Sequence, residues 1–128
     1  LRRAISRAPD HPGARRELGV ALGSRGEYAE AVAQFRYALQ RKPDDVESHL
    51  ALGAVLEKAG ELDEAETALR VGLESAPRDP RLHYRLGLIY LDMHDHARAR
   101  TFLETALEEC GDDRKLRATI QSALDTVR

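Results

Sequence analysis

The chain has 128 residues, the length of one ordinary domain, and its 42% hydrophobic content is sufficient for a packed core. Its net charge of −2 gives no support to a nucleic-acid-binding surface, and no apolar run approaches the roughly 18 residues of a membrane span. A single cysteine excludes an intramolecular disulfide, and the dominance of Ala and Leu favours helices.

One pattern of residues returns every 34 positions along the chain. Its clearest members are a Leu-Gly pair and a large apolar residue further on, found as Leu18-Gly19 with Phe35, Leu52-Gly53 with Leu69, and Leu86-Gly87 with Leu103. A fixed period of this length is typical of stacked identical modules. The period divides most of the chain into units at 12–45, 46–79 and 80–113.

Residues 1–11 precede the first complete unit. One period further on, Leu1 aligns with Phe35 and Pro9 aligns with Pro43. We therefore expect residues 1–11 to be the tail of a truncated preceding repeat, and the chain to be a piece of something longer.

Each unit is predicted to contain two helices. Apolar residues of the first half recur at three- and four-residue spacing, which is the helical period. A break follows at 25–27, 59–61 and 93–95, and the second helices are predicted to begin near Tyr28, Leu62 and His96.

The ends of the predicted helices carry residues with matching chemistry. Pro43 and Pro77 are expected to stop the second helices of the first two units, because proline disrupts a helix interior. Asp45 and Asp79 directly precede the next helices, and each is predicted to cap free N–H groups with its carboxylate.

A glycine lies inside each first helix, where it costs about 1 kcal/mol relative to alanine. Each glycine follows a core leucine and is predicted to face a small alanine of the paired helix, so that the two axes approach closely. The predicted pairs are Gly19 with Ala31, Gly53 with Ala65, and Gly87 with Ala99.

Residues 114–128 are predicted to form a closing helix. Its apolar stripe consists of Leu116, Ile120, Leu124 and Val127. A stack of repeats needs such an end, because its last repeat otherwise exposes a core face.

Taken together, the Leu-Gly pair, the turn glycine, the small alanines and the closing proline in one register resemble the tetratricopeptide repeat family. The resemblance implies an all-α fold, a right-handed α-solenoid of stacked antiparallel helix pairs with a C-terminal capping helix. It also implies that residues 1–128 form one tetratricopeptide repeat domain. Members of this family bind ligands along the concave side, which the first helix of each pair lines.

Mapped onto this sequence, the expected peptide-binding groove combines apolar and basic side chains: Arg16, Val20, Leu50, Ala54, Arg81, Tyr84, Arg85 and Leu88. Leu50, Leu88 and Leu91 fall outside the core phase. They either pack against a neighbouring repeat or await a partner, and the sequence leaves both interpretations open.

Some family members clamp the C-terminal carboxylate of chaperones with basic and Asn side chains. The corresponding positions here are Arg16, Val20, Ala51, Arg81 and Arg85. The basic positions are filled by arginine, but both Asn positions are apolar. This pattern disfavours the clamp, although the arginines would still attract an acidic peptide.

No catalytic, cofactor-binding or metal-binding residues are predicted. The segment Met93-His94-Asp95-His96 is interpreted as a polar turn that has lost its glycine rather than as a Zn²⁺ or Ni²⁺ site. His49 and His83 recur at one period and are assigned packing roles, and Cys110 is assigned a partly buried structural role.

The sequence therefore predicts a non-catalytic scaffold that binds a peptide or helix of a partner protein of unknown identity, without nucleic acid or membrane insertion. One alternative is the regulatory or substrate-selecting region of a larger enzyme. Another is self-association into a homo-oligomer through the uncapped N-terminal end. The high ratio of arginine to lysine suggests a bacterial source, and a cytoplasmic location is favoured.

Overall fold

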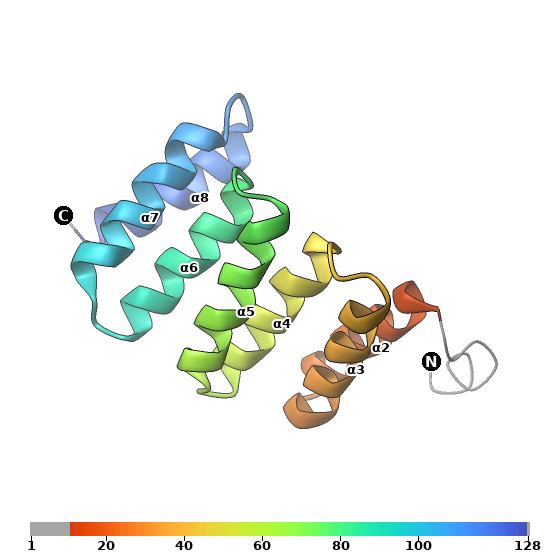
Figure 1. The fold of residues 1–128 in the computed structure, drawn as a ribbon. Coiled ribbons are helices and arrows are strands. Elements are labelled where there is room, and N and C mark those ends of the chain that lie inside the picture. Colours follow the sequence, from red (N-terminus) through yellow and green to blue (C-terminus); the bar gives the residue numbers. More distant parts are fainter. Residues whose placement is uncertain (1–10, 128) are drawn as a thin grey trace.

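The computed structural model describes residues 11–127, which form an all-α array of helices (Figure 1). The helices are α2 (Pro12–Ser24), α3 (Tyr28–Arg41), α4 (Val46–Lys58), α5 (Leu62–Ser75), α6 (Pro80–Asp92), α7 (His96–Glu109) and α8 (Arg114–Asp125). The predicted starts of the second helices, at Tyr28, Leu62 and His96, are confirmed. Residues 1–10, for which the tail of a preceding repeat was predicted, lie outside the described residues.

Three tight turns fold the helices into hairpins. Gly26 and Gly60 connect the first two pairs with φ angles of 80° and 82°, in the left-handed region that favours glycine. His94 takes the equivalent position in the third turn with a φ of 62°. The third turn therefore keeps the backbone geometry of the other two although its glycine has been replaced.

The predicted partners of Gly19 and Gly53 are wrong, and for Gly87 the predicted Ala99 contributes only its carbonyl oxygen, 3.5 Å from where a β-carbon would lie. A β-carbon placed on Gly19 would lie 2.7 Å from Phe35, and one placed on Gly53 would lie 2.6 Å from Leu69. Gly87 faces Leu103 in the same way. The glycines thus accommodate the large residue of the paired helix, one turn beyond the alanine, because residues at similar distances from the turn meet in an antiparallel pair.

One of the two predicted aspartate caps is confirmed and the other is wrong. The Asp79 carboxylate accepts a hydrogen bond from the Arg81 N–H at 2.9 Å, at the start of α6. Asp45 makes no such side-chain cap on α4. Its Oδ2 accepts instead from the Ser48 hydroxyl at 2.6 Å and from Arg16 at 2.7 Å, so competing donors occupy the carboxylate.

A single hydrophobic core runs through the whole stack, from Leu18 in α2 to Val127 after α8. Of the stripe predicted in residues 114–128, Ile120, Leu124 and Val127 are buried, whereas Leu116 is half-buried and packs against the core. Within residues 11–127, no helix has the length and apolar character needed to cross a bilayer. The fold is a helical repeat solenoid.

The two helices of each hairpin occupy different layers. The first helices contact one another, α2 against α4 and α4 against α6. We call the surface of these three helices that points away from α3, α5 and α7 the inner face. A cavity separates the second helices α3 and α5, which belong to the outer layer.

Candidate functional site

All eight predicted groove residues belong to α2, α4 and α6, and the 34-residue period arranges most of them in rows across the inner face. One row is Arg16, Leu50 and Tyr84, and the next is Val20, Ala54 and Leu88. Arg81 and Arg85 lie on α6 beside these rows. The role of these residues in binding stays a prediction.

The apolar residues of the inner face differ in how far their side chains are buried against the core. Leu50, Tyr84 and Leu91 are half-buried and pack against the core. Val20 is 53% exposed, and Leu88 is half-buried. The two interpretations of the out-of-phase leucines thus apply to different residues: Leu50 and Leu91 support the fold, whereas Leu88 stands in the more open row with Val20.

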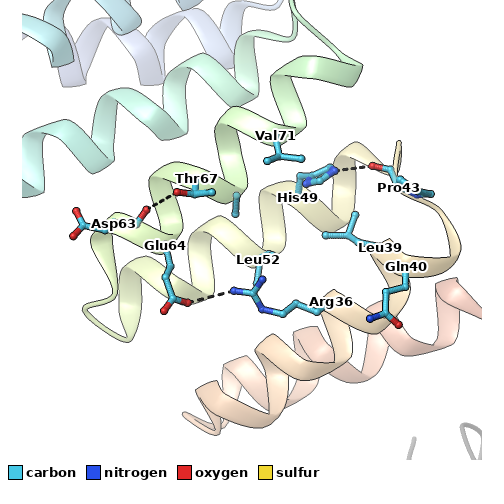
Figure 2. Close-up of a pocket in the computed structure, with 11 residues that line it drawn as sticks. Arg36, Leu39, Gln40, Pro43, His49, Leu52, Asp63, Glu64, Thr67 and Val71 are labelled. Atoms are coloured by element: carbon cyan, nitrogen blue, oxygen red, sulfur yellow. Dashed lines mark hydrogen bonds and ion pairs between the residues drawn. The ribbon is translucent and has the colours of Figure 1, made fainter.

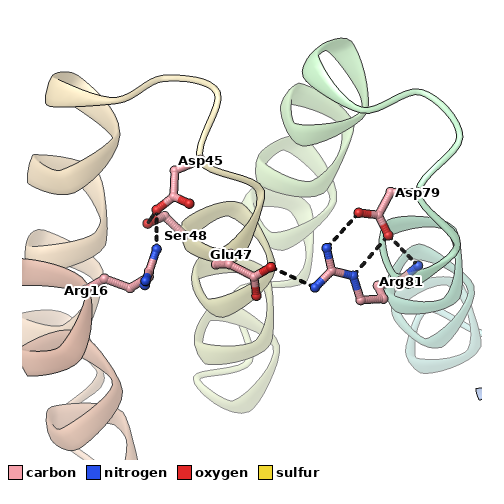
Figure 3. A network of polar contacts seen from close by, with 6 residues as sticks. All are labelled: Arg16, Asp45, Glu47, Ser48, Asp79 and Arg81. Carbon is pink, nitrogen blue, oxygen red and sulfur yellow. Dashed lines mark hydrogen bonds and ion pairs between the residues drawn. The ribbon is translucent and has the colours of Figure 1, made fainter. Parts of the chain in front are cut away.

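Arg16 is held by an acidic group that directly precedes α4 (Figure 3). Its Nη1 lies 2.7 Å from Asp45 Oδ2, which also accepts from the Ser48 hydroxyl. Burial by itself would raise the pKa of Asp45, but the hydrogen bonds from Ser48 and Arg16 hold it below its ordinary value. Asp45 is therefore a buried anion whose charge is matched by Arg16.

Arg81 bridges two carboxylates (Figure 3). Its Nη1 lies 2.7 Å from Glu47 Oε1 on α4, and its Nη2 lies 2.8 Å from Asp79 Oδ2. Hydrogen bonds to Asp79 and Glu47 raise the pKa of Arg81, so the guanidinium remains charged. This second cation of the inner face also has its own counter-ions.

A third charged group lies near the C-terminal ends of α4 and α6. Arg85 Nη1 is 3.9 Å from Glu57 Oε1. Burial, together with a hydrogen bond to Asp92 and the charge of that residue, raises the pKa of Glu57 to about 7. Glu57 thus takes up a proton near neutral pH, beside the side chain of Asp92, which is an arrangement that the sequence analysis missed. The sequence signal for this arrangement is that Asp92 lies two helical turns after Arg85 and therefore on the same face of α6.

These pairs change the expectation for the arginines. Each of the three basic positions that resemble a carboxylate clamp already faces an acidic side chain of this chain. An acidic peptide would have to displace that side chain, and Val20 and Ala51 supply no amide to hold its backbone. The inner face is therefore better suited to apolar contacts than to an anion.

The other residues considered for chemistry, in the turn at 93–96 and at Cys110 and His49, make contacts within the fold. The Asp95 side chain accepts from the Arg98 N–H at 3.1 Å and so caps α7. Within residues 11–127, no group of three or more His, Cys, Asp or Glu side chains is placed to hold a metal ion. Cys110 is buried, and its Sγ donates to the Leu107 carbonyl. His49 is 3% exposed, and its Nε2 lies 2.8 Å from the Pro43 carbonyl oxygen.

A cavity of about 560 Å³ lies between α3 and α5, with His49 and Leu52 of α4 at its base (Figure 2). Sequence reasoning missed it. The sequence signal for it is a difference in side-chain size: Ala68 occupies the repeat position that the large Phe102 occupies one period later.

Two family models, both described as tetratricopeptide repeat, match residues 22–84 and residues 80–113. The chain belongs to the tetratricopeptide repeat family. A search of the curated proteins gave no match.

Solved structures share this tetratricopeptide repeat fold. The Yersinia enterocolitica type III secretion chaperone SycD, in complex with a peptide of the translocator YopD, is 21% identical with a TM-score of 0.82, over 90% of this chain and 90% of that chain. Pseudomonas aeruginosa PcrH, in complex with the chaperone binding region of PopD, is 19% identical with a TM-score of 0.81, over 90% and 89%. TTC0263, a protein of Thermus thermophilus, is 28% identical with a TM-score of 0.82, over 96% and 69%.

Proposed function

We propose that this tetratricopeptide repeat chain is a protein-interaction scaffold, which binds a segment of a partner protein along the inner face of α2, α4 and α6. The observation that carries the proposal is the apolar row of Val20, Ala54 and Leu88, which crosses all three helices. The arginines beside this row are paired with acidic side chains of the chain itself. The proposed role is non-catalytic.

The mechanism is passive. A rigid face offers an apolar row, and the apolar side chains of the partner segment lose their contact with water when they cover it. The paired arginines add polar contacts at the rim without a strong attraction for anions. We therefore expect the partner segment to be a peptide or amphipathic helix with regularly spaced apolar side chains.

The fold comparison supports this proposal. The solved SycD and PcrH structures contain peptide segments of the proteins YopD and PopD. The two alternatives from the sequence, an arm of a larger enzyme and self-association through the N-terminal end, concern residues outside 11–127 and stay predictions.

The test uses a peptide selected on the wild-type chain from a random displayed library, with its Kd measured by fluorescence anisotropy. Leu88→Glu and Val20→Glu place a carboxylate in the apolar row. We expect each to weaken binding at least about 10-fold, because burying one aliphatic side chain is worth about 1.5–3 kcal/mol.

The matched control is Ala33→Glu, which adds the same charge at an exposed site on the outer helix α3. We expect it to leave the Kd unchanged. Leu50 and Tyr84 are unsuitable for this test because they also pack against the core. Equal binding by the wild type, Leu88→Glu and Val20→Glu would refute the inner face as the site.

A further inference from the structure

The cavity between α3 and α5 is independent of the inner face. His49 and Leu52, which line it, lie on the side of α4 opposite Leu50 and Ala54, because each residue advances about 100° around a helix. The walls are largely apolar and include Leu39, Pro43, Ala68 and Val71. The volume of about 560 Å³ is within the usual range of ligand pockets, about 300–1,000 Å³.

The next junction of the same chain shows what fills such a space. Phe102 of α7 stands one period after Ala68 and projects toward α6. Its ring centroid lies 5.8 Å from that of His83 and 5.2 Å from that of Tyr90. At the first junction the side chain of Ala68 ends at Cβ, and the aromatic ring has no counterpart. The chain therefore contains its own example of the missing group.

The arginine beside the Phe102 ring also has an equivalent one period earlier. The Arg70 Cζ lies 5.5 Å from the Phe102 centroid, which is a cation–π distance. Arg36 stands one period before Arg70 and lines the cavity. Its Nη2 is 3.3 Å from Glu64 Oε2, and both side chains are more than half exposed, so this ion pair is weak. Arg36 is therefore available to stack on a ring that enters from outside.

The rim of the cavity adds an acidic group. Asp63 lines the cavity at the start of α5 and is exposed. Within residues 11–127 its carboxylate has no ion-pair partner, whereas the neighbouring Glu64 is paired with Arg36. A ligand that carries a positive charge beside its aromatic group would therefore complement this rim.

We propose that this outer cavity is a second binding site, which receives the aromatic side chain of a partner polypeptide, with a basic residue of that partner lying next to it against Asp63. The partner's ring takes the position that Phe102 occupies at the following junction. Arg36 covers the ring as Arg70 covers Phe102.

The test is an NMR titration of the isotope-labelled chain with the blocked peptide acetyl-Ala-Phe-Arg-Ala-amide. We expect amide shifts in α3 and α5. The decisive variant is Ala68→Phe, which fills the cavity with the chain's own ring in the manner of Phe102. It should weaken binding at least 10-fold, and thermal unfolding should show that the chain remains folded. Val71→Asp, at a wall residue that is 42% exposed, should also weaken binding and does not depend on core packing.

Two further comparisons test the charge and the location. Asp63→Asn, or the peptide acetyl-Ala-Phe-Glu-Ala-amide with the wild-type chain, should weaken binding about three-fold. Leu88→Glu should leave the Kd unchanged, because it alters only the inner face. This last comparison separates the present proposal from the proposed function, since either site can fail while the other survives.

Several results would overturn the proposal. These are unchanged binding by Ala68→Phe and Val71→Asp, peptide shifts confined to α2, α4 and α6, or equal affinity for the two peptides. A concentration-dependent dimer that Ala68→Phe abolishes in sedimentation would identify a second copy of this chain as the occupant and would also reject the partner proposed here.

Discussion

At the scale of single residues, the tightest constraint lies where a glycine of one helix meets a large residue of its pair. The Leu69 side chain is fully buried and lies within 3 Å of the place where a methyl group on Gly53 would be. Glycine is therefore required at this position by the neighbouring side chain, despite its low helix propensity.

Gly53→Ala should destabilise the fold by about 1–2 kcal/mol, because overpacking of about 1–3 kcal/mol exceeds the helix propensity gained. Urea unfolding followed by circular dichroism measures this loss. In the double variant Gly53→Ala/Leu69→Ala the two changes should couple, so that the total loss is smaller than the sum of the single losses. Strictly additive losses would show that the two residues do not collide.

The raised pKa of Glu57 makes stability depend on pH. Because the folded-state pKa of Glu57 is raised to about 7 from an ordinary value of 4.5, the folded chain holds a proton that the unfolded chain has lost between these values. Stability therefore falls as pH rises through this window. Glu57→Gln should match the wild type near pH 5 and be more stable at pH 8, by an amount on the order of 2 kcal/mol.

Unfolding at both pH values measures the difference, and Asp92→Asn should reproduce the gain at pH 8 because it removes the other carboxylate. A wild type whose stability is the same at pH 5 and pH 8 would contradict the raised pKa of Glu57.

At the scale of helices, the ends were more predictable than the contacts between them. Glycine at a positive φ angle and proline after a helix act within a few residues, so the sequence alone located Tyr28, Leu62 and His96 as helix starts. The pairing of Gly53 with Leu69 depends on how far two antiparallel helices slide along one another, which helical phase does not report. The Asp45 carboxylate likewise could not be assigned from local sequence, because it accepts a hydrogen bond from Arg16, 29 residues away.

The closing helix α8 can be tested through one buried side chain. Ile120 is fully buried, so Ile120→Ala should destabilise the chain by about 2–5 kcal/mol through lost contacts and a new cavity. Ser122→Ala, at an exposed position of the same helix, should change stability by less than about 0.5 kcal/mol. Thermal unfolding compares the two, and similar stabilities would mean that α8 contributes little to the stack.

At the scale of the whole molecule, the junctions between hairpins are unequal. The second junction contains Phe102, together with the Tyr90 hydroxyl hydrogen-bonded to Glu66 and Arg70. At the first junction, the cavity takes the place of the ring. In a repeat array, stability is approximately a sum of units and junctions, so the N-terminal hairpin should be held less firmly.

Hydrogen exchange followed by mass spectrometry should reveal this gradient. We expect the central amides of α2 and α3 to exchange faster than those of α6 and α7, because local opening of the first hairpin breaks fewer contacts. The comparison is internal, since the hairpins have equal helix lengths. Equal protection along the chain would show that the stack opens only as one cooperative unit.

The candidate site was predictable in part. The period made Val20, Ala54 and Leu88 equivalent, because residues 34 apart occupy equivalent places in a regular stack, and the family resemblance assigned this row to the inner face. The acidic partners of the arginines could not be predicted in the same way. Asp45, Glu47 and Glu57 meet the arginines through side-chain conformations that depend on the spacing of neighbouring helices.

The first helix of each hairpin and the closing helix begin at residues 12, 46, 80 and 114, which are equal intervals along the chain. A duplicated copy of residues 46–79, spliced in after Asp79, would therefore keep every loop length and would place a fourth hairpin in phase. Each such duplication adds one more helix to the inner face. The surface proposed for binding can thus lengthen by gene duplication, a whole module at a time, while the existing side chains keep their places.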